Sequence, residues 1–257
     1  MAIVNLKSME NSMYISLIKL FLIFIIISFL GYLLEIVVCS YNYKKIVNRG
    51  FFFGPYCPIY GLGGLVIIWC LNRYYEDPIV VFVMGTVLTS LIEYYTSYVL
   101  EKIFHNRWWD YSDRRDSING RICIGNSIFF GIGSLLIIYY LYPAILSLFA
   151  LFTNQTLVII GTILLIIFMI DVIASFVIAY NLRHRIIIAE ELKAEKLKKI
   201  PFIINKKYKE EIEKLKIVSN RLIKAFPNIS KNNEEELDII WKFRKNLKES
   251  KKNKKAK

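Results

Sequence analysis

The chain has 257 residues, 55% of them hydrophobic, and a mean hydropathy of +0.42. Residues 183–257 carry 23 Lys and Arg against 11 Asp and Glu, which accounts for +12 of the net charge of +13. A soluble globular protein distributes its charge along its length, so this segregation excludes that class. It predicts a membrane domain over residues 1–182 and a basic soluble tail over residues 183–257.

Five apolar segments have about the 20 residues that a helix needs to cross a bilayer. They are residues 16–39, 51–71, 78–101, 122–148 and 156–181. The first exceeds the ~7–15-residue apolar core of a cleaved signal peptide and has no clear cleavage site, so we interpret it as a retained helix. Pro143 could split the fourth segment into a span and a short interfacial piece. The predicted fold is an all-α, polytopic membrane helix bundle of about five transmembrane helices.

The distribution of basic residues predicts the orientation of the bundle. The linkers after the first and third spans and the tail are rich in Lys and Arg, whereas residues 72–77 hold one Arg and residues 152–155 hold no charge. Since basic linkers face the cytoplasm, we expect the N-terminus outside and the tail in the cytoplasm. The tail itself is predicted to form helices, partly disordered at its end, over residues 185–199, 206–225 and 234–249.

Metal and nucleotide sites have no support in the sequence. The four cysteines form no C-x-x-C pair, and the two histidines, His105 and His184, are far apart. This pattern predicts neither a zinc site nor a disulfide framework, and we expect no cofactor. The G-x-x-x-x-G-K-[ST] phosphate loop is also absent, so any nucleotide hydrolysis would have to come from another chain.

Charges inside the predicted spans gather in the half of the membrane next to the basic linkers. Each costs roughly 2.5–3.5 kcal/mol on insertion scales, so their positions carry information. Glu93, Ser97 and Glu101 recur every four residues and therefore share one helix face. The simplest interpretation is one polar site, open to the cytoplasm, in which carboxylates face arginines: Glu35, Glu93 and Glu101 opposite Arg49, Arg107 and Arg121. The alternative is that these helix-end charges extend to the lipid headgroups.

Two polar stretches complete the candidate site. Residues 48–60, NRGFFFGPYCPIY, combine glycines that permit close helix approach with prolines that break a helix, which favours either a cavity or tight packing. Residues 107–121, RWWDYSDRRDSINGR, are more polar than a plain connection requires, and their tryptophans fit an interfacial belt or a re-entrant turn. With the charges of the spans, the predicted site comprises Glu35, Asn48, Arg49, Tyr60, Glu93, Glu101, Arg107, Trp108, Trp109, Asp110, Tyr111, Ser112, Asn119, Arg121 and Asp171.

These motifs carry a family resemblance. NRGFFFGPYCPIYGLGG, the span with Glu93 and Glu101, and RWWDYS followed by INGRICI resemble the putative ABC-transporter type IV permease family of bacterial membrane proteins. The resemblance covers roughly residues 23–148 and leaves the tail outside. It implies an integral protein of the bacterial plasma membrane that serves as a permease. The matching positions are the predicted site residues of these stretches, without Asp171, together with Gly50, Pro55, Pro58, Gly61 and Gly120.

Three functions remain open at this point. The first is a permease subunit, served by a separate cytoplasmic ATPase that docks on residues 107–121. The second is an intramembrane enzyme or lipid-binding protein that acts on an anionic lipid headgroup at the inner leaflet; Glu93, Glu101 and Asp110 would be its acid or base, but no nucleophile motif supports catalysis. The third is a non-catalytic scaffold or sensor whose basic tail is drawn to anionic lipid. A homo-oligomer is compatible with the transport function, and the Glu residues interleaved in the tail disfavour nucleic-acid binding.

Overall fold

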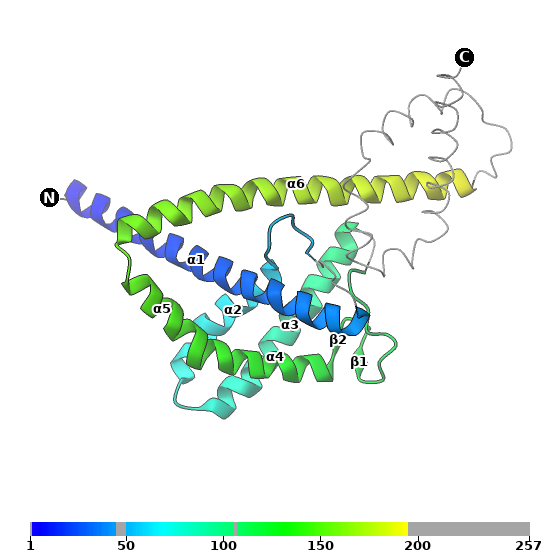
Figure 1. Cartoon of the computed structure of the whole chain (residues 1–257), viewed down its shortest axis with the longest axis horizontal. Coiled ribbons are helices and arrows are strands. Elements are labelled where there is room, and N and C mark those ends of the chain that lie inside the picture. Colours follow the sequence, from blue (N-terminus) through cyan, green and yellow to red (C-terminus); the bar gives the residue numbers. More distant parts are fainter. Residues whose placement is uncertain (1, 45–49, 105–106, 195–257) are drawn as a thin grey trace, which may run out of the picture. The chain divides into compact units, whose positions relative to one another are not determined.

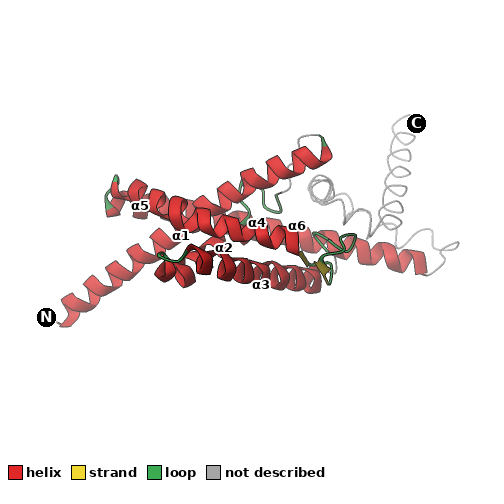
Figure 2. Cartoon of the chain, turned by 90° about the horizontal axis from the view of Figure 1, so that it is seen from below, coloured by secondary structure: helices red, strands yellow, loops and turns green. Residues whose placement is uncertain are grey.

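The computed structural model describes residues 2–44, 50–104 and 107–194. Backbone contacts divide the chain into two units, Met1–Val99 with Asp110–Ala174 and Leu100–Trp109 with Ser175–Lys257, which are considered separately. The elements, shown in Figure 1 and Figure 2, are α1 (Ala2–Tyr43), α2 (Pro58–Leu71), the 3-10 turn η1 (Asn72–Tyr74), α3 (Pro78–Phe104), β1 (Ser117–Ile118), β2 (Ile122–Cys123), α4 (Ile124–Leu136), the π-helical turn η2 (Ile137–Leu141), α5 (Tyr142–Ala150) and α6 (Asn154–Ala194).

The predicted helical membrane fold is confirmed, with four rather than five full-length spans. Within the described residues, the helices long and apolar enough to cross a bilayer are Ser12–Tyr41, Pro78–Phe104, Ile124–Ala150 and Asn154–Tyr180. The second predicted span is helical only over the 14 residues of α2. That is about 21 Å, less than the ~30 Å of a bilayer core. The prolines at positions 55 and 58 explain the difference, because the residue before a proline is driven out of the α conformation.

The chain therefore re-enters the membrane domain before α2 begins. The backbone N–H of Cys57 donates to the carbonyl of Ser28, at 2.9 Å. Ser28 lies near the middle of the first span, Ser12–Tyr41. Residues 50–57, here called the re-entrant loop, thus bring non-helical backbone to the middle of a transmembrane helix. Such backbone needs hydrogen-bond partners inside the protein, since hydrocarbon offers none.

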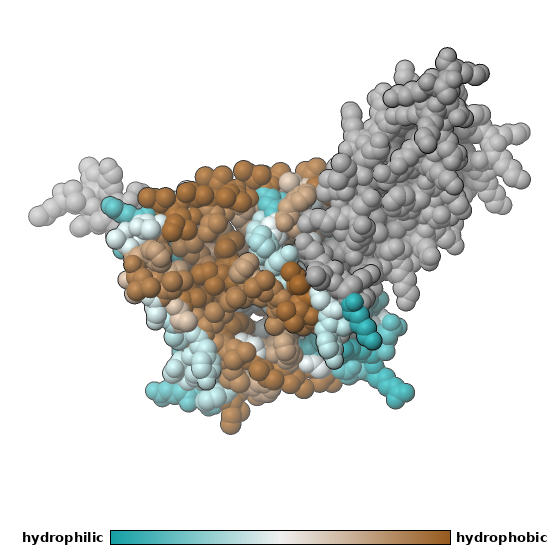
Figure 3. Space-filling view, in the orientation of Figure 1, coloured by the Kyte–Doolittle hydropathy of each residue, from teal (hydrophilic) through white to brown (hydrophobic). Residues whose placement is uncertain are grey.

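Helix α2 packs closely along α1 because glycines line the contact. A side-chain carbon at Gly61 would lie 2.7 Å from the backbone oxygen of Phe24, and one at Gly64 would lie 2.6 Å from Ile27. The buried core of the first unit continues from these two helices into α3, η2 and α5 through Ile23, Ile27, Ile67, Ile68, Leu71, Val81, Ile138 and Ile145. Outside this core, hydrophobic residues occupy much of the coloured face in Figure 3, with hydrophilic residues toward its edges, as expected for protein that faces lipid.

Pro143 bends the fourth predicted span without dividing it. Proline lacks the N–H of a helical residue, and its ring clashes with the carbonyl four residues earlier. The π-helical turn η2 directly precedes Tyr142 and Pro143 and widens the helix at this point. Helices α4 and α5 consequently meet at a bend (Figure 1), yet they form one candidate span, Ile124–Ala150.

Helix α6 joins the last predicted span to the beginning of the tail. It runs without interruption from Asn154 to Ala194, so the predicted helices at residues 156–181 and 185–199 are continuous as far as Ala194. The predictions for residues 206–225 and 234–249 lie outside the described residues. Helix α6 begins after a Thr153 cap, where the backbone N–H of Thr156 donates to the Thr153 hydroxyl at 3.2 Å.

Candidate functional site

Two membrane carboxylates of the first unit each accept a hydrogen bond from a tyrosine. Tyr60 of α2 donates to Oε1 of Glu35 on α1 at 2.8 Å. Tyr111, in the segment between α3 and β1, donates to Oε1 of Glu93 on α3 at 3.2 Å. Burial, and then the negative charges of Glu93 and Glu35, raise the pKa of Tyr111. The Tyr111 hydroxyl therefore stays protonated at neutral pH, and both carboxylates lie near enough to influence it.

Glu93 is the more buried of these two acids. Its side chain is 6% exposed, and among the described residues its Oε2 atom has no hydrogen-bond partner. A buried polar atom without a partner is costly to keep, and a carboxylate inside a membrane helix more so. Glu93 thus presents an acceptor that the described part of the chain leaves open.

Arg121 brings a buried positive charge to α3, the helix that carries Glu93. It is 9% exposed, and its Nη1 donates to the hydroxyl of Ser97 at 3.2 Å, one helical turn from Glu93. The guanidinium also lies 5.7 and 5.5 Å from the ring centroids of Tyr94 and Tyr98. Both distances are within the range of cation–π attraction. Glu35, Tyr60, Glu93, Ser97, Tyr111 and Arg121 are called the polar cluster below.

A short hairpin positions Arg121. Strands β1 and β2 pair antiparallel, with Ile118 opposite Ile122. Asn119 and Gly120 form the turn of this hairpin, with φ of 53° and 67°. Asn and Gly tolerate such positive values best. The Asn119 side chain also donates to the Tyr94 hydroxyl at 3.0 Å and so ties the turn to α3. The chain then leaves the turn with Arg121 beside Ser97.

The remaining residues of the 107–121 stretch have local roles in the geometry. In the second unit, Arg107 forms an ion pair with Glu101 at 3.2 Å. Trp108 there is 4% exposed and packs edge-on against Phe104, so it lies inside protein rather than in an interfacial belt. Trp109 is half-buried. In the first unit, the backbone and hydroxyl of Ser112 both donate to Asp110, at 3.0 and 2.6 Å, in an exposed turn.

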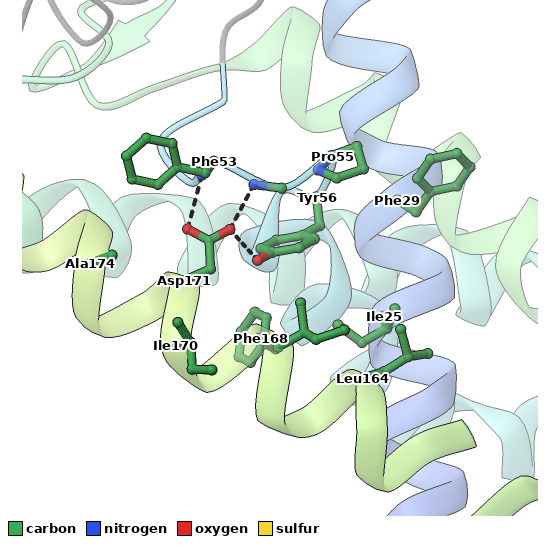
Figure 4. Close-up of a pocket in the computed structure, with 12 residues that line it drawn as sticks. Ile25, Phe29, Phe53, Pro55, Tyr56, Leu164, Phe168, Ile170, Asp171 and Ala174 are labelled. Carbon is green, nitrogen blue, oxygen red and sulfur yellow. Dashed lines mark hydrogen bonds between the residues drawn. The ribbon is translucent and has the colours of Figure 1, made fainter. Parts of the chain in front are cut away.

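Asp171 on α6 contacts the re-entrant loop (Figure 4). Its Oδ1 accepts from the backbone N–H of Phe53 at 3.0 Å, and its Oδ2 accepts from the backbone N–H of Gly54 at 2.6 Å and from the Tyr56 hydroxyl. These bonds satisfy donors that no regular helix would satisfy at this depth. Asp171 therefore anchors the loop, a role distinct from the shared polar site that the sequence predicted for it.

The structure brings together part of the predicted site. The first unit holds Glu35, Tyr60, Glu93, Tyr111, Asn119 and Arg121, on α1, α2, α3, the hairpin and the segment that leads to it. Asn48 and Arg49 lie outside the described residues. Among the described residues, Glu35 and Glu93 accept hydrogen bonds from tyrosine hydroxyls, and their predicted pairing with arginines stays a prediction because Arg49 lies outside the described residues. Tyr94 and Tyr98 were not predicted, although their four-residue spacing already puts these two rings on one face of α3. Among the described residues, no group of three or more His, Cys, Asp or Glu side chains is arranged to hold a metal ion.

Comparison with known proteins places the chain in a family. A family model described as putative ABC-transporter type IV matches residues 22–176, more than half of the chain. The chain belongs to this family. The match to the ABC-transporter type IV model covers the polar cluster, the re-entrant loop and most of the α6 span, and so extends beyond the predicted resemblance. Searches of curated proteins and of solved structures give no match. Together with the four apolar spans, the family identifies a multi-pass membrane protein associated with transport.

Proposed function

We propose that this ABC-transporter type IV protein is the membrane subunit of an ATP-driven permease, and that the polar cluster contacts a polar substrate on its way through. The Oε2 atom of buried Glu93, which has no hydrogen-bond partner among the described residues, is the observation that carries this proposal. In a membrane helix, a carboxylate with an unfilled acceptor is expensive, and such residues mark transport pathways more often than they stabilise a fold. Arg121 nearby supplies the opposite charge, so a substrate with both donor and acceptor groups fits the cluster.

The energy for transport would come from a second protein. This chain has no phosphate loop, and an ABC-type permease therefore requires a separate ATPase. The segment from Asp110 to Arg121 is suited to receive it, because exposed charges alternate there with residues that reach α3. Tyr111, Asn119 and Arg121 contact Glu93, Tyr94 and Ser97. A displacement of this segment by a docked ATPase would act on the polar cluster directly. The proposed orientation has the N-terminus outside and this segment in the cytoplasm of a bacterium.

Substitution within the polar cluster tests its role. Glu93→Gln keeps the shape of the side chain and removes its charge, and Arg121→Ala removes the opposite charge. Hydrogen bonds to charged groups contribute about 1.5–3 kcal/mol, so each change should weaken transport roughly 10- to 150-fold. The measurement is rescue of a deletion strain by each variant, with membrane levels of the protein followed in parallel.

Glu76→Gln is the matched control, because Glu76 is an exposed acid in the linker before α3, outside both the polar cluster and the connecting segment. It should rescue the deletion strain as well as the wild-type chain does. If Glu93→Gln and Arg121→Ala also rescued it fully at normal protein levels, the polar cluster would have no part in transport.

A further inference from the structure

An apolar groove runs between two membrane-spanning helices of the first unit. It has a volume of about 640 Å³, within the range of pockets that hold small organic ligands. One wall is α1, with Ile25 and Phe29, and the other is the part of α6 from Leu164 to Ala174. Residues 53–56 of the re-entrant loop close it on a third side (Figure 4).

The groove is lined mainly by apolar side chains. Its charged residue, Asp171, receives hydrogen bonds from two backbone N–H groups of the loop and from the Tyr56 hydroxyl, and these partners offset its charge. The Tyr56 ring packs against Phe168 with centroids 5.3 Å apart, which adds an aromatic surface to the wall. A charged or strongly polar ligand would leave its own groups without partners here, so the chemistry selects an apolar occupant.

The position of the groove further limits the kind of molecule that can occupy it. Ile167 and Ile170 on its α6 wall are 54% and 64% exposed, and both lie within the span Asn154–Tyr180. Side chains exposed at that depth face lipid tails. A specific protein–protein interface buries roughly 800 Å² on each partner. A groove of this size has room for one thin chain, which would bury a far smaller area. We propose that the groove binds one hydrocarbon chain of a bilayer lipid, held between α1 and α6 against the re-entrant loop.

Occupancy would stabilise the loop beside its hydrogen bonds to Asp171, because the residues that form these bonds also line the groove. Tyr56 and Phe168, which line the groove, also stack with Phe52 at centroid distances of 5.7 and 6.1 Å. A hydrocarbon chain lying against these rings would fill the space beside them and hold the loop against α6. This inference does not depend on the proposed permease function, because it concerns a different set of residues from the polar cluster.

Photo-crosslinking with a defined lipid tests the proposal. The full chain would be reconstituted in bilayers that contain phosphatidylglycerol with a diazirine in one acyl chain, irradiated, digested and analysed by mass spectrometry. Labelling should concentrate on residues 25–29 and 164–174 rather than spread over all lipid-facing helices. Ile167→Trp, which fills the groove, should reduce that labelling several-fold.

The chain supplies a close control for this substitution. Ile166 is the neighbouring residue on α6 and is 56% exposed, but it does not line the groove, so Ile166→Trp should leave the labelling unchanged. If Ile167→Trp failed to fold, Ala174→Leu on the groove side and Ile173→Leu beside it would form a second pair. Even labelling of all spans, equal effects of the two Trp variants, or crosslinks from the groove to another protein segment would overturn the proposal.

Discussion

Replacing Asp171 with Ala is expected to lower the melting temperature of the protein in detergent by roughly 10 °C. The change removes the acceptor for two backbone N–H groups and one hydroxyl in the middle of the membrane domain. In hydrocarbon, each donor left without a partner costs about 1–3 kcal/mol, because lipid offers no acceptor to replace the carboxylate. The re-entrant loop should detach from α6, which limited proteolysis within residues 50–57 would also detect.

Asp77→Ala is the control for this experiment. Asp77 also accepts two backbone hydrogen bonds, from Ile79 and Val80 at 3.1 Å each, but it does so as an exposed cap at the start of α3. Loss of such a cap costs about 0.5–2 kcal/mol, so a fall of only a few degrees is expected. Equal shifts for the two variants would mean that Asp171 does not anchor buried backbone.

Gly61→Ala should be the second strongly destabilising change, because it forces α1 and α2 apart. The new methyl group would meet the Ser28 hydroxyl and lie 2.6 Å from the Phe24 ring and 2.7 Å from the Phe24 carbonyl oxygen. A backbone oxygen cannot rotate away as a side chain can. Overpacking of this kind costs about 1–3 kcal/mol, which a thermal-unfolding curve in detergent can measure.

Gly63→Ala, two residues further along the same helix, is expected to have the opposite sign. A side-chain carbon at Gly63 would meet no atom within 4 Å. Alanine stabilises a helix relative to glycine by about 0.8–1.0 kcal/mol, so the melting temperature should rise slightly. If both alanine variants raised it, the close contact between α1 and α2 would be ruled out.

The helices of this fold could be predicted because each is encoded locally by a run of apolar residues. The misjudged segment was 51–71, where hydropathy alone suggests a span. Pro55 and Pro58 gave the correct signal, since they exclude a helix before residue 58. The uninterrupted course of α6 was harder to predict. The sequence changes from apolar to basic after Asn181, which suggests the end of a helix, although no residue there breaks one.

The sequence indicates which residues to consider for the candidate site better than it indicates how they are arranged in space. Burial cost identifies Glu35, Glu93 and Asp171 from the sequence alone, and the Asn119-Gly120 turn is a local signal. Which donor meets each acid depends on how helices pack, so the hydrogen bonds from Tyr60 and Tyr111 could not be read from charge matching. The bonds from the re-entrant loop to Asp171 join positions far apart in the sequence, and no local pattern encodes them.

The central claim, that this protein is the membrane subunit of an ATP-driven permease, is tested most directly by its partners. The intact chain would be purified in mild detergent and the co-purifying proteins identified by mass spectrometry. We predict a stoichiometric P-loop ATPase, whose recovery falls when Arg114 and Arg115 in the connecting segment are changed to Glu. Recovery of the chain alone, or as a homo-oligomer that carries only lipid, would contradict the claim.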